Sequence, residues 1–183
     1  MLRNLDKNKK LGSVTFAHFV LRAKNLSKSV SWYQTVLGMK IQHGNPQIVF
    51  LTYDDEHHRL AIVQAPSLEE VPKGSAGVDH VAYTLESLED LLSLYLKLKG
   101  QEVMPVWSIN HGLTTSLYYE DPDRNRVEFQ VENFNTKEEL NTYITGTAFA
   151  ENPIGVNFDP EKLAHRFKNG DPMEELLQLG STS

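Results

Sequence analysis

The sequence predicts an α+β protein built from two βαβββ modules in one chain. The main observation is a repeat. A segment with strand character, an amphipathic helix and three further short strands occur over residues 13–64 and again over residues 77–132. Equivalent residues are 62 positions apart, because His18 and Gly38 correspond to His80 and Gly100. Each unit alone exposes one face of its sheet, so two units can bury helices outside and curl their sheets around a shared cleft. The alternative is coincidence between two αβ segments.

Composition sets the broad class. The chain has 183 residues, 40% of them hydrophobic, which is enough for a sizeable core. A formal net charge of −6 without a long basic run argues against nucleic-acid binding. The absence of cysteine excludes disulfides and thiolate ligands, so any metal must bind through His, Asp or Glu. No apolar run approaches 18 residues, and residues 1–12 have the composition of a flexible leader. We expect a cytoplasmic protein without a membrane partner.

In the first module, Val, Thr and Phe enrichment predicts a strand over residues 13–21 that contains His18. Asn25 or Ser27 can cap the following helix, which should end at Gly38. Its apolar residues recur at three- and four-residue steps: Leu26, Val30, Tyr33 and Leu37. Three short strands follow, predicted over residues 39–42, 47–53 and 59–64.

A linker rich in Pro, Ser, Glu and Gly, residues 65–76, separates the modules. The second module repeats the pattern, with a strand containing His80 and a helix that ends at Gly100. The predicted strands are residues 78–84, 101–106, 114–119 and 126–131, and the helix is residues 85–99. The last two strands form a hairpin around the turn at residues 121–125.

The hairpin carries a carboxylate that points away from the apolar layer. In its second strand Val127, Phe129 and Val131 share one face, so Glu128 lies on the other face. A carboxylate there needs a cation, and His18 and His80 are candidate partners for the same ion.

Three stretches carry a family resemblance: residues 16–41, residues 78–83 (VDHVAY) and residues 116–129 (SLYYEDPDRNRVEF). Together they resemble the vicinal oxygen chelate superfamily, which includes glyoxalases, bleomycin-resistance proteins and type I extradiol dioxygenases. The resemblance covers residues 14–132 and implies paired modules that form a half-open barrel around a metal. It implies that His18, His80 and Glu128 are the metal ligands. Two imidazoles and one carboxylate leave open positions, an arrangement suited to Fe(II) enzymes that bind substrate and dioxygen together.

Two other classes remain open within this family. Glyoxalase-like isomerases or lyases take a fourth ligand from the last strand of the first module, where the repeat pairs Ala61 with Glu128. Alanine cannot bind a metal, although Gln64 could serve if the register were shifted. A non-enzymatic binding protein of the drug-resistance type would need only an apolar cleft.

The resemblance also implies further site residues. In the tandem pair His57 and His58, the second histidine resembles the extradiol acid and base, and His57 supports it at the substrate site. Tyr118 resembles the tyrosine that binds a substrate hydroxyl, although strand parity alone does not exclude Tyr119. His111 is a further substrate-site candidate. Trp32 and Trp107 are predicted to be packing residues.

Residues 134–183 form a C-terminal extension outside the repeat. Helices are predicted over residues 137–143 and 160–167, with a pinned loop over residues 149–158 between them. Residues 149–177 resemble the C-terminal extension of single-domain extradiol enzymes. The extension is either a lid that keeps water from the metal or a cover for a sheet edge or an oligomer contact.

The sequence therefore predicts an Fe(II)-dependent extradiol dioxygenase. It would insert both atoms of O2 into a catechol-type aromatic diol, with ring cleavage beside the two hydroxyls. Mn(II) suits the same ligands. We expect a homo-oligomer, although the repeat allows a complete metal site within one chain.

Overall fold

The computed structural model describes residues 12–69 and 75–183 of the chain. The chain divides into two units, Met1–Leu68 and Glu69–Ser183, and each is described by itself. The predicted leader lies outside the described residues except for Gly12, and so does the middle of the predicted linker, residues 70–74.

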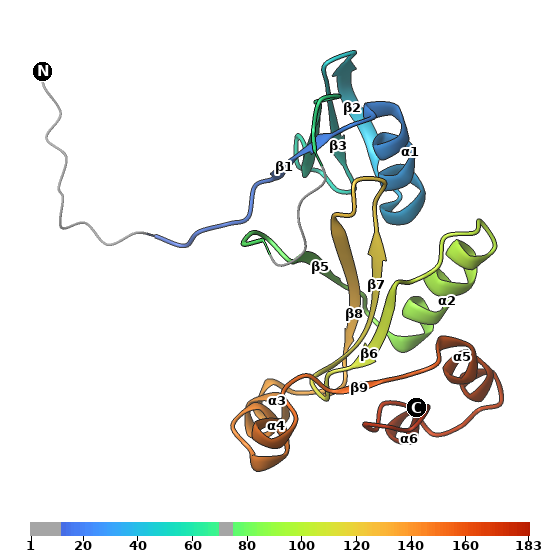
Figure 1. The fold of residues 1–183 in the computed structure, drawn as a ribbon. Coiled ribbons are helices and arrows are strands. Elements are labelled where there is room, and N and C mark those ends of the chain that lie inside the picture. Colours follow the sequence, from blue (N-terminus) through green and yellow to red (C-terminus); the bar gives the residue numbers. More distant parts are fainter. Residues whose placement is uncertain (1–11, 70–74) are drawn as a thin grey trace, which may run out of the picture. The chain divides into compact units, whose positions relative to one another are not determined.

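The first unit is one βαβββ module (Figure 1). Its elements are β1 (Phe19–Ala23), α1 (Leu26–Leu37), β2 (Lys40–Asn45), β3 (Ile48–Thr52) and β4 (Leu60–Gln64). The sheet has the order β1-β4-β3-β2, with β1 parallel to β4 and the other neighbours antiparallel. Both of its antiparallel pairs join strands that are consecutive in the chain.

Helix α1 covers one face of this sheet. Both ends of the helix are capped, and its apolar side chains form one stripe. The Asn25 side chain accepts a hydrogen bond from the Lys28 backbone N–H at 3.0 Å, and Gly38 ends the helix in the left-handed region at φ 65°. The buried stripe includes Val30 and Tyr33 and packs on β3 and β4. The predicted helix is confirmed.

The second unit repeats this module and extends it. Its elements are β5 (His80–Thr84), α2 (Leu88–Lys99), β6 (Trp107–Asn110), β7 (Thr114–Glu120) and β8 (Arg126–Glu132). The strand order is β5-β8-β7-β6-β9, with β5 parallel to β8. The predicted α+β fold with two βαβββ modules is therefore confirmed. Each sheet is open and does not close on itself into a barrel.

Three predicted strands need correction. The first begins at Phe19 and not at residue 13, so His18 lies directly before β1, and β5 begins at His80 itself. Residues 101–106 form no strand, because the backbone N–H groups of Gln101, Glu102 and Val103 bind the last carbonyls of α2 and cannot join a ladder. Glu102 takes a left-handed conformation at φ 61° in this turn, and the strand starts only at Trp107.

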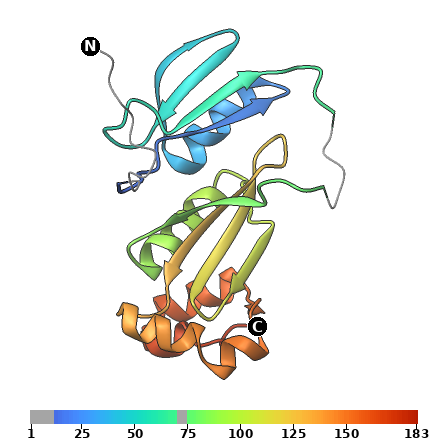
Figure 2. The same cartoon turned by 90° about the vertical axis from the view of Figure 1, so that its left-hand side faces the viewer.

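The C-terminal extension belongs to the second unit, and its helices gather at one end of the sheet of that unit (Figure 2). Its elements are α3 (Lys137–Ile144), α4 (Thr147–Glu151), β9 (Val156–Asn157), α5 (Pro160–Lys168) and α6 (Met173–Leu176). Both predicted helices are confirmed. The predicted loop at residues 149–158 instead contains the end of α4 and β9, which pairs with β6. The extension thus covers a sheet edge, one of the two roles that the sequence left open.

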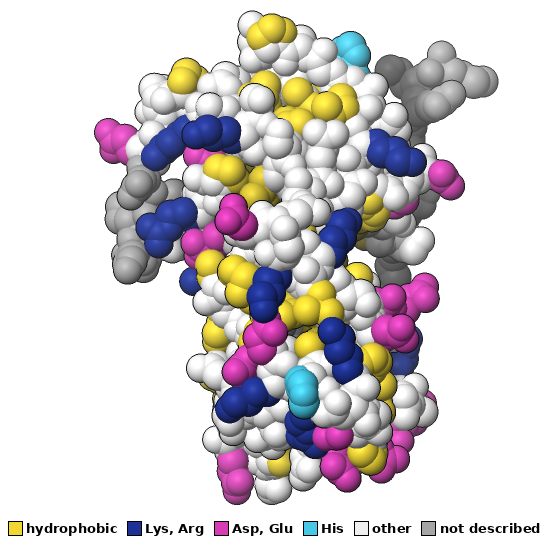
Figure 3. Space-filling model, turned by 90° about the vertical axis from the view of Figure 1, so that its right-hand side faces the viewer, with side chains coloured by type: hydrophobic (Ala, Val, Ile, Leu, Met, Phe, Trp, Pro, Cys, Tyr) yellow, Lys and Arg dark blue, Asp and Glu magenta, His cyan; other side chains and the backbone are white. Residues whose placement is uncertain are grey.

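Charge is dispersed on the face drawn in Figure 3, where basic and acidic side chains are interspersed over the described residues. Nowhere in residues 12–69 and 75–183 is a helix long and apolar enough to cross a membrane.

Candidate active site

Glu128 is a buried carboxylate in the middle of β8, with only 4% of its surface exposed. Its cross-strand partners are Ala82 on β5 and Tyr118 on β7. Since side chains alternate along a strand, these neighbours share the sheet face that is opposite to α2. A buried carboxylate requires partners that compensate its charge.

His80 provides the nearest such partner. Its Nε2 atom lies 3.0 Å from Oε2 of Glu128, while its Nδ1 atom lies 2.8 Å from the carboxylate of Asp79. A carboxylate oxygen only accepts, so Nδ1 carries the proton that Asp79 accepts. In a neutral imidazole Nε2 is then a bare lone pair that faces Glu128, and the two acceptors repel unless a proton or a metal ion lies between them. The donor set therefore fits a cation site.

Asp79 orients this histidine in the manner of carboxylates that support metal-binding imidazoles. The hydrogen bond from His80 lowers the pKa of the Asp79 carboxyl, which keeps it ionised. Asp79 is a site residue that was not predicted, although the Asp-His dipeptide is visible in the second module.

Tyr118 lies beside this pair. Its ring centroid is 5.2 Å from that of His80, and its hydroxyl is 3.0 Å from Nε2 of His111. Burial raises the pKa of the Tyr118 hydroxyl, and its hydrogen bond to Glu128 and the charge of that carboxylate raise it further. Tyr119 instead packs against Phe129 on the other face, and its buried hydroxyl finds no hydrogen-bond partner among the described residues.

Trp107 forms a cluster of three rings with Tyr118 and His111. Its ring centroid is 4.8 Å from that of Tyr118 and 5.7 Å from that of His111. Trp107 is predicted from the sequence only as a packing residue, because no local pattern shows that β6 brings it across from Tyr118.

In the first unit, His18 lies against the tandem histidines. Its ring centroid is 4.2 Å from His58 and 6.3 Å from His57, and the His58 ring also meets Phe50 edge-on at 5.0 Å. Burial lowers the pKa of His58, and the charges of His18 and His57 lower it further. The His57 side chain contacts His58 through its Nδ1 atom and is 67% exposed.

Arg59 holds this arrangement together. Its Nη1 atom donates to the carbonyl oxygens of Phe16 at 2.6 Å and Ala17 at 3.1 Å, the two residues directly before His18. Asp54 in turn accepts from Arg59 Nε at 3.0 Å and pairs with Nη2 at 2.9 Å. The guanidinium therefore ties the segment that carries His18 to the turn that carries His58.

The structure brings together some of the predicted site residues within each unit. His80, Glu128, Tyr118 and His111 meet in the second unit, and His18, His57 and His58 meet in the first. Among the described residues, no group of three His, Asp or Glu side chains is arranged so that it could hold a metal ion. The third predicted metal ligand, His18, belongs to the other unit.

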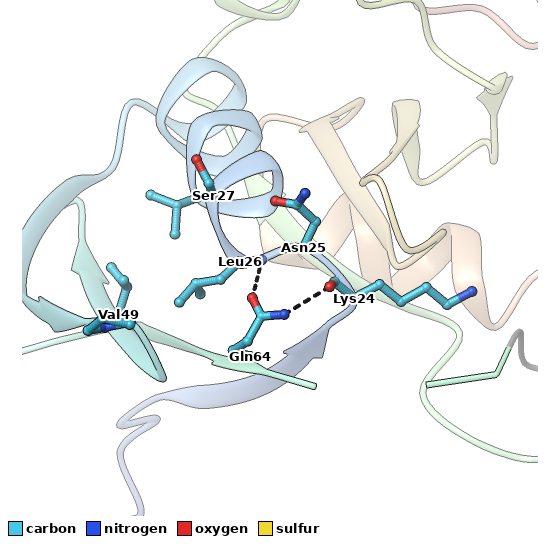
Figure 4. Close-up of a pocket in the computed structure, with 8 residues that line it drawn as sticks. Lys24, Asn25, Leu26, Ser27, Val49 and Gln64 are labelled. Carbon is cyan, nitrogen blue, oxygen red and sulfur yellow. Dashed lines mark hydrogen bonds between the residues drawn. The ribbon is translucent and has the colours of Figure 1, made fainter. Parts of the chain in front are cut away.

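Strand register tests where a fourth ligand could come from. Val20 pairs with Ala61 in the first module, and Ala82 pairs with Glu128 in the second. Ala61 is therefore the structural equivalent of Glu128, as the repeat predicts, and it offers no donor atom. Gln64 is not shifted into that place, because its side chain accepts from the Leu26 N–H at 2.8 Å and donates to the Lys24 carbonyl at 2.9 Å beside a cavity (Figure 4).

Comparison with known proteins identifies the family. Residues 15–129 match the family model described as "Glyoxalase/Bleomycin resistance protein/Dioxygenase superfamily". The chain belongs to this superfamily. Among solved structures, a glyoxylase/bleomycin resistance protein/dioxygenase domain from Frankia sp. EAN1pec has a TM-score of 0.56 and 18% sequence identity, covering 71% of this chain and 98% of that chain. That likeness supports the superfamily fold alone.

Two curated members of the superfamily are much closer in sequence. Biphenyl-2,3-diol 1,2-dioxygenase 2 from Rhodococcus globerulus is 42% identical over 162 residues, covering 88% of this chain and 85% of the relative. Biphenyl-2,3-diol 1,2-dioxygenase 3 from the same organism is 43% identical over 162 residues, covering 87% and 85%. They confirm the predicted enzyme class, an extradiol ring-cleavage dioxygenase.

Proposed function

We propose that this chain is an Fe(II)-dependent extradiol dioxygenase that cleaves a catechol-type diol beside its two hydroxyls and inserts both atoms of O2. The observation that carries the proposal is the pair of His80 Nε2 and Glu128 Oε2, 3.0 Å apart, with Tyr118 and His111 on the same side of the sheet. The names of the two curated relatives support an aromatic diol, of which biphenyl-2,3-diol is the first candidate.

The residues proposed to hold the metal are His18, His80 and Glu128. Two imidazoles and one carboxylate suit Fe(II), and Mn(II) accepts the same donors. When bound, the ion supplies positions for the diol and for O2 and a path for electrons between them.

Tyr118 and His111 are proposed to bind the diol. The Tyr118 hydroxyl stays protonated at neutral pH, the more so because its pKa is raised, so it has one hydrogen to donate and lone pairs that accept. Its position opposite Glu128 supports a role in binding an oxygen of the substrate. Because Tyr118 and Glu128 are opposite each other on neighbouring strands, the residue proposed to orient the substrate lies next to a proposed metal ligand.

His58 is proposed to move protons. A diol must lose a proton on binding, and ring cleavage needs an acid at a departing oxygen. An imidazole performs both tasks near neutral pH. His57 contacts the His58 ring and supports it at the substrate site.

A glyoxalase-like isomerase or lyase is the second candidate, and the first module speaks against it. That class takes a protein ligand from the strand position that Ala61 occupies here, and the Gln64 side chain is already bonded to the backbone before α1. A metal-independent binding protein would not need the His80, Asp79 and Glu128 chain of contacts.

The proposal is tested with the full chain loaded anaerobically with Fe(II) or Mn(II). We expect oxygen uptake and a yellow product on addition of 2,3-dihydroxybiphenyl or catechol. Isomerase activity with Ni(II) or Zn(II) and without oxygen would favour the second candidate, and inactivity across a panel of catechols would refute the dioxygenase.

A variant separates the role of His58 from a general effect of losing a histidine. His58→Ala should keep its metal and lose most turnover. His43→Ala, which removes an exposed histidine from β2 of the same module, should retain both. Full turnover in His58→Ala would remove that residue from the mechanism. Light scattering of the purified protein tests the expected homo-oligomer.

A further inference from the structure

A short segment of the C-terminal extension, residues 154–157, runs along the edge of the second sheet. Its strand β9 pairs antiparallel with β6, with Asn157 opposite Ile109 and Val156 opposite Asn110 (Figure 1). The neighbouring residues of β6 and of the loop after it carry two members of the ring cluster, Trp107 and His111.

The segment fixes the His111 ring through a backbone atom. Nδ1 of His111 is hydrogen-bonded to the carbonyl oxygen of Ile154. A carbonyl oxygen only accepts, so Nδ1 must carry the hydrogen. In the neutral imidazole Nε2 is then the acceptor, and it faces the Tyr118 hydroxyl at 3.0 Å, whose single hydrogen can go either to Nε2 or to Glu128. The extension thus selects both the tautomer and the orientation of His111.

The same segment fixes the Trp107 ring. The indole Nε1–H donates to Oδ1 of Asn157 at 2.8 Å. The ring that is held in this way lies 4.8 Å from the Tyr118 ring. Both rings that flank Tyr118 are therefore tied to one short segment.

Gly155 allows the segment to approach this closely. Its φ of 105° is in the left-handed region, and an added Cβ would lie 2.1 Å from the Asn110 carbonyl oxygen and 2.7 Å from His111 Cα. Both neighbours are backbone atoms that cannot swing aside. Asn152 braces the turn by accepting from the Gly155 N–H at 2.9 Å and donating to its carbonyl at 3.1 Å.

The ring cluster borders an open cavity of about 650 Å³ that is lined both by the sheet and by residues 154–157. Trp107 and Ile109 line it from the sheet, and Ile154 and Val156 line it from the segment. A shift of the segment would therefore move a wall of the cavity together with His111.

We propose that residues 154–157 position the substrate-binding rings, with Gly155 as the positioning residue that brings the Ile154 carbonyl to His111 and Asn157 to Trp107. This inference rests on the proposed function, since it assigns the segment a part in orienting the diol. Turnover would then depend on a residue that touches neither metal nor substrate.

The test compares Gly155→Ala with Gly170→Ala. Gly170 also has a left-handed backbone, at φ 82°, but an added Cβ there meets nothing within 4 Å. Both variants carry the cost of an alanine at positive φ, and only the first displaces the segment. We expect Gly155→Ala to lose roughly 10- to 100-fold in kcat, as for a misplacement on the order of 1 Å, with metal content retained. Equal activity in the two variants would overturn the proposal.

A second measurement reads the position of His111 without turnover. Nitrogen-15 NMR of the histidine rings of the full chain, with His111 assigned by its loss in His111→Gln, should show Nδ1 protonated and Nε2 bare in the wild type. Gly155→Ala should lose that pattern and Gly170→Ala should keep it. A wild-type His111 without a proton on Nδ1 would overturn the proposal even if Gly155→Ala failed to fold. If the wild type cleaves no diol, the proposed function fails, and the NMR result still decides the positioning.

Discussion

Replacing Asp79 by alanine should weaken metal binding without touching a ligand. The carboxylate accepts from Nδ1 of His80 at 2.8 Å and so favours the tautomer whose Nε2 lone pair is available to a metal. Without this acceptor the imidazole can take the other tautomer, in which Nε2 carries the proton and donates to Glu128. That tautomer must be given up before a metal binds, and the cost appears as lost affinity.

The magnitude follows from the exposure of the pair. Carboxylates that orient a metal-binding histidine are worth about 10- to 100-fold in affinity. The Asp79 side chain is 74% exposed, so solvent screens its charge and the lower end applies. We expect the Kd for Mn(II) to rise about 10-fold in Asp79→Ala, equivalent to ~1.4 kcal/mol. Asp79→Asn keeps an acceptor but not the charge, so its Kd for Mn(II) should lie between those of Asp79→Ala and the wild type.

Calorimetric titration of the metal-free protein measures this effect. Glu174→Ala is the matched control, because it removes one exposed carboxylate from α6, away from the site, and should leave the Kd unchanged. At saturating metal, Asp79→Ala should recover most of its turnover. An unchanged Kd in Asp79→Ala, or an equal loss in Glu174→Ala, would refute the orienting role.

Three further predictions follow from the described contacts. Tyr118→Phe should lower kcat roughly 10- to 100-fold with metal retained. Tyr119→Phe removes a buried hydroxyl that has no hydrogen-bond partner among the described residues, and it should raise the free energy of unfolding by up to ~1 kcal/mol in urea titrations. Arg59→Met should release the segment before β1 and weaken metal binding, which the same calorimetry measures; an unchanged Kd would contradict this. Lys99, followed by Tyr95, lowers the pKa of Glu161, so this carboxylate stabilises the fold above the ordinary carboxyl pKa and loses that effect as the pH falls through its lowered value. Glu161→Gln should lower the free energy of unfolding by about 0.5 kcal/mol at pH 7, a small loss because the Lys99–Glu161 pair is half exposed, and should have no effect in strong acid. A loss that does not depend on pH would refute the assignment.

The modules could be predicted because their signals are local. The apolar steps of α1, the cap at Asn25 and the alternation along β8 are all visible within one turn or one strand. The offset of 62 positions then places His18 and His80 at equivalent points, at the start of β1 and β5.

The errors arise where tertiary contacts decide the backbone. Residues 101–106 resemble a strand, but their N–H groups close the end of α2. Strand β9 is only two residues long and exists because β6 offers it a ladder, so no periodicity could reveal it. Parity across the hairpin turn could not choose between the two tyrosines, and the pairing of Tyr118 with Glu128 settles their faces.

Labelled dioxygen tests the central claim most directly. The purified chain, loaded with Fe(II), is given 2,3-dihydroxybiphenyl under ¹⁸O₂, and the product is analysed by mass spectrometry. An extradiol dioxygenase of the proposed type yields a ring-opened product that carries both labelled atoms. A ring-opened product without label from O₂, or a product whose ring is intact, would contradict the account.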